Sequence, residues 1–328
     1  MNKPRTARQT GDVIFRAVAS GWQKWRQEGE GSLQLASEAP ALSALKPEAG
    51  GVIAVPVRRA FSLAVWVPSG DPALFGDLVY TQLELHGLAG RDRDSTAFIW
   101  RSIATRDGET LIHAIVLPPH LDSKYWHGDV TSYAVSPACL PLAPDTVTVW
   151  EEEGGWVASV TRGQELLHFQ PLTSQVPGDA MALEIWLLLA PLEAGKMLDG
   201  SPSVHVLYQG LEPPDLGDWR SASDLAVSAS PLPPPVVPAQ NLQCMPLPVR
   251  EVRKSKEASS RRQKIALAAA AAYFLVVLAL AGSTFFLQWR AESLRKLVAR
   301  DAGAVAAIPA PTARWETMQA DLDPATYP

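Results

Sequence analysis

The sequence predicts a mixed α/β body of two related lobes, followed by a linker and a single membrane-spanning helix. Strand-like segments give way to a helical segment twice within residues 1–211, a proline-rich stretch follows, and residues 265–289 carry no charge. The chain of 328 residues is 47% hydrophobic and contains 11 Trp, which is enough apolar surface for a folded core. A broadly disordered protein is therefore excluded.

The first lobe is expected over residues 1–135. Alternating β-branched and aromatic residues predict strands over 13–18, 52–57, 62–67, 97–104 and 111–117. Apolar spacing predicts a helix over 72–87, and a further helix over 118–128 is considered after a Pro pair. Trp22 and Trp25 lie among basic residues, which fits a membrane-surface helix, but Glu28 and Glu30 favour folded edge structure instead.

The second lobe is expected over residues 136–211. Strands are predicted over 146–151, 156–161, 165–170 and 204–208. A helix is predicted over 178–193, with Asp179 as its N-cap. Gly154 and Gly155 indicate a tight hairpin between the first two strands, because Gly accepts a positive φ.

Residues 212–264 are expected to form a linker that is first rich in proline and then basic. Nine prolines lie within residues 212–248, which excludes a continuous helix or a central strand there. An extended, polyproline-like linker is the default interpretation.

The membrane span is predicted from Ile265 to Trp289. A helix of these 25 residues rises about 1.5 Å per residue and crosses a hydrocarbon core of about 30 Å. A buried core helix is the alternative, but core helices are seldom apolar on every face over such a length. Trp289 stands where an interfacial aromatic residue is expected.

The flanking charges predict the orientation of the span. Residues 250–264 carry 7 Lys and Arg against 2 Asp and Glu, whereas fewer basic residues follow the span. The basic flank comprises Arg253, Lys254, Lys256, Arg261, Arg262 and Lys264, after Arg250. The positive-inside rule therefore places the N-terminal body in the cytoplasm and residues 290–328, a juxtamembrane helix and tail, in the periplasm.

The body is acidic, and it carries no recognisable catalytic motif. Residues 1–249 hold 17 Lys and Arg against 27 Asp and Glu, a net charge of −10, which argues against a nucleic-acid partner. His120 and His127 lack a third ligand nearby, and Cys139 lies in an apolar run that suits a buried thiol. We expect no catalytic residue, cofactor or metal site.

Several segments resemble the inner-membrane L protein family of the bacterial type II secretion system, and the actin-like and bitopic pair of type IV pili. The resemblance is carried by residues 52–56, 62–68 and 78–84 in the first lobe, residues 146–150, 155–160 and 166–170 in the second lobe, residues 241–243 before the basic run, and residues 288–298 after the span. It implies a two-lobed actin-like, ribonuclease H-like domain. Glu151 and Glu152 beside the glycine turn would repel phosphate, so we expect this fold without ATPase chemistry.

The resemblance also implies a function and partners. It implies a structural adaptor in the bacterial inner membrane that recruits a hexameric secretion ATPase and couples it to a bitopic M-type protein and a polytopic platform protein. A homodimer is also considered, although the family's small ferredoxin-like periplasmic domain has no counterpart in the 39 residues after Trp289. The alternatives are a membrane-anchored nucleotide-binding enzyme and a single-pass envelope signalling protein.

Overall fold

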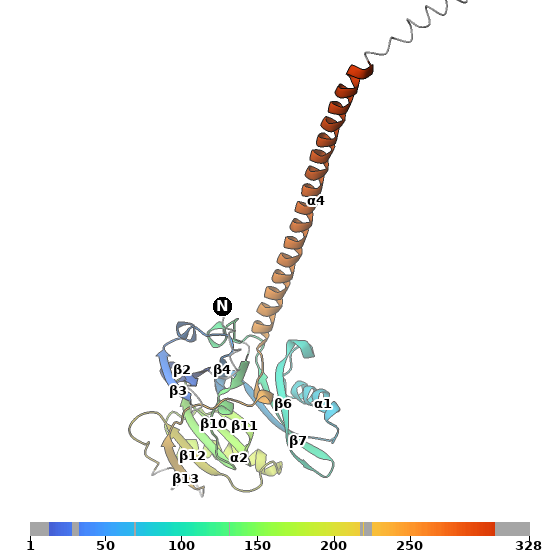
Figure 1. The fold of residues 1–328 in the computed structure, drawn as a ribbon. Coiled ribbons are helices and arrows are strands. Elements are labelled where there is room, and N and C mark those ends of the chain that lie inside the picture. Colours follow the sequence, from blue (N-terminus) through green and yellow to red (C-terminus); the bar gives the residue numbers. More distant parts are fainter. Residues whose placement is uncertain are drawn as a thin grey trace, which may run out of the picture. The chain divides into compact units, whose positions relative to one another are not determined.

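The computed structural model describes residues 13–27, 33–68, 70–130, 132–216, 219 and 225–305 (Figure 1). The chain divides into two units, Met1–Ser255 and Lys256–Pro328, and each is described by itself. The first unit contains both lobes. The second contains most of the long helix α4 (Leu247–Val305).

The first lobe is built on a five-stranded sheet in the order β3-β2-β1-β4-β8. Its strands are β1 (Val13–Val18), β2 (Gly21–Gln27), β3 (Leu33–Ala39), β4 (Val52–Val55) and β8 (Ser132–Val135). Strands β1 to β3 pair antiparallel, while β4 lies parallel to β1 and β8 parallel to β4. A single 3-10 turn, η1 (Leu42–Leu45), connects β3 to β4.

The second lobe repeats this arrangement in the order β11-β10-β9-β12-β13. Its strands are β9 (Thr146–Glu152), β10 (Gly155–Arg162), β11 (Glu165–Pro171), β12 (Ser203–Tyr208) and β13 (Val227–Pro231), with helix α2 (Asp179–Ala194) between β11 and β12. Again the first three strands are antiparallel and the last two parallel. Two lobes of this ribonuclease H-like topology define an actin-like body, which confirms the predicted fold class.

The first lobe also carries an insertion between β4 and β8. It comprises β5 (Phe61–Val67), α1 (Pro72–Leu85), β6 (Ala97–Arg106) and β7 (Glu109–Leu117), with the strands in the order β5-β7-β6. Helix α1 begins as the sequence dictates, because Asp71 caps it through the Ala73 amide at 2.9 Å and Pro72 occupies its first turn. Its Phe75, Val79 and Leu83 pack on this small sheet.

Each main sheet has two apolar faces. In the second lobe, one face packs on α2 through Met181, Ile185 and Leu188, which form a cluster with residues of β9, β10 and β12. The other face contributes Trp150 and Phe169 to a cluster shared with the first lobe. Asp179 stands in the first turn of α2 and Gly178 is the N-cap, so the predicted cap is displaced by one residue.

Residues 227–249 of the predicted linker are folded, contrary to the prediction. Strand β13 extends the second sheet, where its terminal Pro231 is tolerated because β13 lies at the sheet edge. Residues 232–249, which we call the tether, then lie on the first lobe. The Val236 amide donates to the Cys139 carbonyl at 2.8 Å, and the Cys244 amide donates to the Tyr133 carbonyl at 2.7 Å. The proline-rich tether is therefore packed against the first lobe by hydrogen bonds to its backbone.

Two further expectations concern the first lobe. Residues 118–128 do not form a helix, since they contain only the 3-10 turn η4 (Ser123–Tyr125). Trp22 and Trp25 lie on β2, so the folded alternative is confirmed and the membrane-surface helix is wrong. The remaining 3-10 turns are η2 (Val57–Arg59), η3 (Arg93–Ser95), η5 (Ser136–Cys139) and η6 (Gln240–Leu242). The predicted tail over 306–328 lies outside the described residues.

Candidate functional site

Helix α4 contains the whole predicted span from Ile265 to Trp289. Its large apolar side chains are exposed on all sides, and none of its most apolar window is buried within the protein. Exposing so many apolar side chains to water is unfavourable, so the helix requires an apolar environment. Its length and composition fit a single-pass membrane anchor, and the alternative of a buried core helix is not supported.

The basic flank lies on the same helix, immediately before the span. Arg253 is half-buried, and the side chains of Lys254, Lys256, Arg261, Arg262 and Lys264 are exposed. Exposed Lys and Arg at this place can contact anionic headgroups. The helix also includes the predicted juxtamembrane residues 288–298. At their start, the Trp289 ring lies 6.2 Å from the ring of Phe286 in the preceding turn.

A second candidate site is the β9–β10 turn, which holds the glycines expected near a phosphate in an actin-like enzyme. Glu153 and Gly154 form the turn with positive φ values of 52° and 70°. Glu152 precedes it and is fully buried, and its Oε2 accepts the Val57 amide at 2.7 Å. Burial raises the pKa of Glu152 to about 8, although the nearby Ser136 hydroxyl and the hydrogen bond from the Val57 amide oppose this shift.

Two arginines of the first lobe occupy the space around this turn. Arg58 donates to the carbonyls of Leu172 at 3.0 Å and Trp156 at 3.3 Å. It lies so close to Gly155 that a Cβ there would collide with the guanidinium. Arg59 contacts the Glu153 carboxylate at 3.6 Å. The turn therefore forms a charged contact between the lobes.

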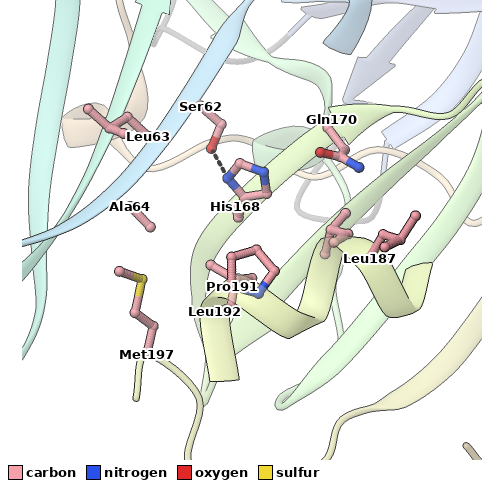
Figure 2. Close-up of a pocket in the computed structure, with 10 residues that line it drawn as sticks. Ser62, Leu63, Ala64, His168, Gln170, Leu187, Pro191, Leu192 and Met197 are labelled. Carbon is pink, nitrogen blue, oxygen red and sulfur yellow. Dashed lines mark hydrogen bonds between the residues drawn. The ribbon is translucent and has the colours of Figure 1, made fainter. Parts of the chain in front are cut away.

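A third candidate is a pocket of about 290 Å³ between β5, β11 and α2 (Figure 2). At its polar end Ser62 Oγ lies 3.0 Å from His113 Nε2 and 3.1 Å from His168 Nδ1. The Phe169 amide also donates to Ser62 Oγ at 3.2 Å. Figure 2 shows Ser62 bonded to His168, with Leu192 and other apolar side chains lining the rest.

Burial keeps both histidines neutral. It lowers the pKa of His113 to about 3, with further lowering from His168 and Arg101, and it lowers the pKa of His168 to about 4. Neither ring can therefore act as a base matched to neutral pH. Sequence reasoning missed this network, because one Ser and two His separated by long stretches of chain form no motif.

The other predicted chemistry-bearing residues remain apart. His120 and His127 do not share a helix, since residues 118–128 form none. Among the described residues no group of three His, Cys, Asp or Glu could hold a metal. Cys139 is buried as predicted, and burial raises the pKa of its thiol to about 12.

No protein-family model matches the chain, and neither does any curated protein. Among the solved structures similar to it are the following three. The cytoplasmic domain of EpsL, an inner-membrane component of the type II secretion system of Vibrio cholerae, is 12% identical with a TM-score of 0.42, covering 67% of this chain and 89% of that one. The PilM-PilN type IV pilus biogenesis complex gives 12% identity and a TM-score of 0.47, with coverages of 68% and 89%.

The third is a Bacteroides thetaiotaomicron protein of unknown function with an actin-like ATPase fold. It is 9% identical with a TM-score of 0.35, and the match covers 70% of this chain and 94% of that one. At these identities the similarity is one of fold.

Proposed function

We propose that the protein is a structural adaptor in the inner-membrane assembly platform of a type II secretion or type IV pilus-like machine. The actin-like body recruits the hexameric secretion ATPase in the cytoplasm, and α4 couples it to bitopic and polytopic membrane partners. One observation carries the proposal. The chain passes from the buried core of the first lobe at Val249, within α4, into a helix long and apolar enough to cross a membrane.

Tethering and electrostatic attraction together explain how such an adaptor would work. A domain tethered through one membrane helix holds a soluble ATPase at a high effective concentration near the platform. The net charge of −10 on residues 1–249 steers a basic face of the partner towards the body. Neither effect requires chemistry by the body itself.

The contacts at the β9–β10 turn support a role without catalysis. An ATPase needs backbone amides and cations that face phosphate. Here the buried Glu152 and the Arg58 guanidinium face the opposite lobe, and their hydrogen bonds are made within the protein. We therefore propose that the body is not an enzyme.

The test is chemical crosslinking of the full-length protein in its native membranes, followed by affinity purification and mass spectrometry. We expect a hexameric secretion-type ATPase together with small bitopic membrane proteins. Recovery of neither, while crosslinking within the protein is efficient, contradicts the adaptor role. Saturable heat in a calorimetric titration of the full-length protein with Mg-ATP would favour the nucleotide-binding alternative.

The orientation is tested with a matched pair of variants on α4, Ser259→Cys before the span and Ala291→Cys after it. Both positions are exposed. We expect a membrane-impermeant thiol reagent to label Ala291→Cys in spheroplasts and Ser259→Cys only after permeabilisation. The reverse pattern places the body in the periplasm and rules out contact with a cytoplasmic ATPase.

A further inference from the structure

The outer face of α2 is apolar, although it faces solvent. Leu183, Trp186 and Leu187 are 57%, 60% and 55% exposed. Their spacing of three and four residues places them on one side of the helix. The opposite side, with Ile185 and Leu188, is buried in the second lobe.

Helix α1 shows that such a face is not general in this body. Its exposed leucines, Leu74 and Leu85, stand 11 residues apart and therefore do not form a patch. Isolated exposed leucines are normal on protein surfaces, whereas contiguous ones with a Trp among them mark interaction sites. The α2 face is contiguous and contains Trp186, so it has the features of an interaction site.

The pocket described above adjoins this face. Leu187 belongs to both, and Pro191 and Leu192 continue the helix wall of the pocket (Figure 2). Leu63 and Met197 line the pocket from other elements. A ridge of apolar side chains beside a pocket of about 290 Å³ suits a partner that inserts one large apolar side chain and packs others alongside it.

The charges of α2 distinguish between a second copy of the chain, a lipid surface and a basic partner protein. The charged residues of α2 are Asp179, Glu184 and Glu193, all acidic, and the one basic residue close by in the chain is Lys196. A second copy packed antiparallel on this face would bring Asp179 towards Glu193 of the other copy, which is repulsive. An anionic lipid surface is disfavoured for the same reason. A basic partner is attracted.

We propose that Leu183, Trp186 and Leu187, together with the adjoining pocket, form a docking surface for an amphipathic helix of a partner protein, apolar on one face and flanked by Lys or Arg. The apolar stripe supplies the contact area, and the carboxylates at both ends of α2 attract the basic flanks of the partner helix. This surface is a feature beyond the adaptor role, and the partner helix can belong to any cytoplasmic component.

The test uses the full-length protein in its native membranes with p-benzoylphenylalanine in place of Trp186. The matched control carries the same photoreactive residue in place of Leu85, an exposed leucine on α1. After irradiation, crosslinked peptides are identified by mass spectrometry. We expect adducts at position 186 that map to an amphipathic helix with basic flanks in another protein, in several-fold higher yield than at position 85.

A charge-reversed double variant, Asp179→Lys with Glu193→Lys, separates the electrostatic part. Both side chains are exposed, so the fold is expected to persist. We expect the adduct yield at position 186 to fall several-fold. Adducts to α2 of a second copy, to phospholipid, or to a segment without basic residues overturn the proposal, and so do equal yields at positions 186 and 85.

Discussion

The two lobes share one strand order but cover their sheets differently. Between its third and fourth strands the second lobe has a helix of 16 residues, α2, whereas the first lobe has only the four-residue turn η1. The first lobe completes its core with residues from distant parts of the chain, among them Leu242, Cys244 and Val249 of the tether. The segment that leads to the membrane is therefore a structural part of the first lobe.

The largest expected effect lies on α2. Ile185 is fully buried against the second sheet, and Ile185→Ala removes three carbon atoms from a packed core. We expect the free energy of unfolding to fall by about 2–5 kcal/mol. Denaturant unfolding of the full-length protein in detergent measures it, with Leu183→Ala on the exposed face as control, expected within about 0.5 kcal/mol. Equal losses would show that α2 is not the cover of this sheet.

Val249→Ala tests the tether in the same way. Val249 is fully buried in the first lobe, and losing two methyl groups there costs about 1–3 kcal/mol. Val298→Ala, at an exposed position of α4, is the control and should leave body unfolding unchanged. If the Val249 variant is as stable as the natural protein, the tether does not stabilise the first lobe, and the extended linker predicted from the prolines is correct.

Acid should weaken the contact between the insertion of the first lobe and the second lobe. The pKa of an unfolded histidine is about 6.5, but burial lowers the pKa of His168 to about 4 and that of His113 to about 3 in the folded protein. Between these values the unfolded state binds more protons, so stability falls as pH drops below about 6.5, by roughly 1 kcal/mol per pH unit for each histidine.

The variant His168→Asn retains a polar group near Ser62 and removes the titration. Its unfolding free energy should depend less on pH between about 4 and 6.5 than that of the natural protein. The exposed His86→Asn is the control. Identical pH profiles for His168→Asn and the natural protein would contradict the buried neutral state.

Glu152→Gln tests the buried carboxyl by the same linkage, with the opposite sign of the pH dependence. Since the pKa of Glu152 is raised from 4.5 to about 8, the folded state retains a proton that the unfolded state loses in this interval. The natural protein therefore loses stability as pH rises from about 5 to 8, and the variant should lose less. Unfolding at both pH values measures the difference. A variant that is destabilised equally at both would indicate an ionised, paired carboxylate.

The sequence predicted the strands with strong apolar alternation, and it missed those whose pattern is broken. Trp22 and Trp25 stand three apart on β2, a spacing that mimics a helix, and in the sheet they belong to clusters on opposite faces. Strand β3 is largely exposed, and β13 ends in Pro231 at a sheet edge. Neither has the apolar alternation that a single sequence can reveal.

For the candidate site, the membrane helix was predictable because apolar length is a local property. The contacts around Glu152 and Ser62 were not, because each joins residues about 50 or more positions apart. The folded state of the tether escaped prediction for the same reason. Proline content describes local backbone freedom and says nothing of the long-range hydrogen bonds to Cys139 and Tyr133.

Cys139 and Cys244 are the chain's two cysteines, and both are buried where the tether meets the first lobe. Burial raises the pKa of each thiol to about 12, so neither reacts while the tether is in place. Reaction with a thiol reagent therefore requires the tether to open. The rate at which the reagent modifies Cys244 reports how often this segment lifts from the body, in the natural chain and without an attached probe.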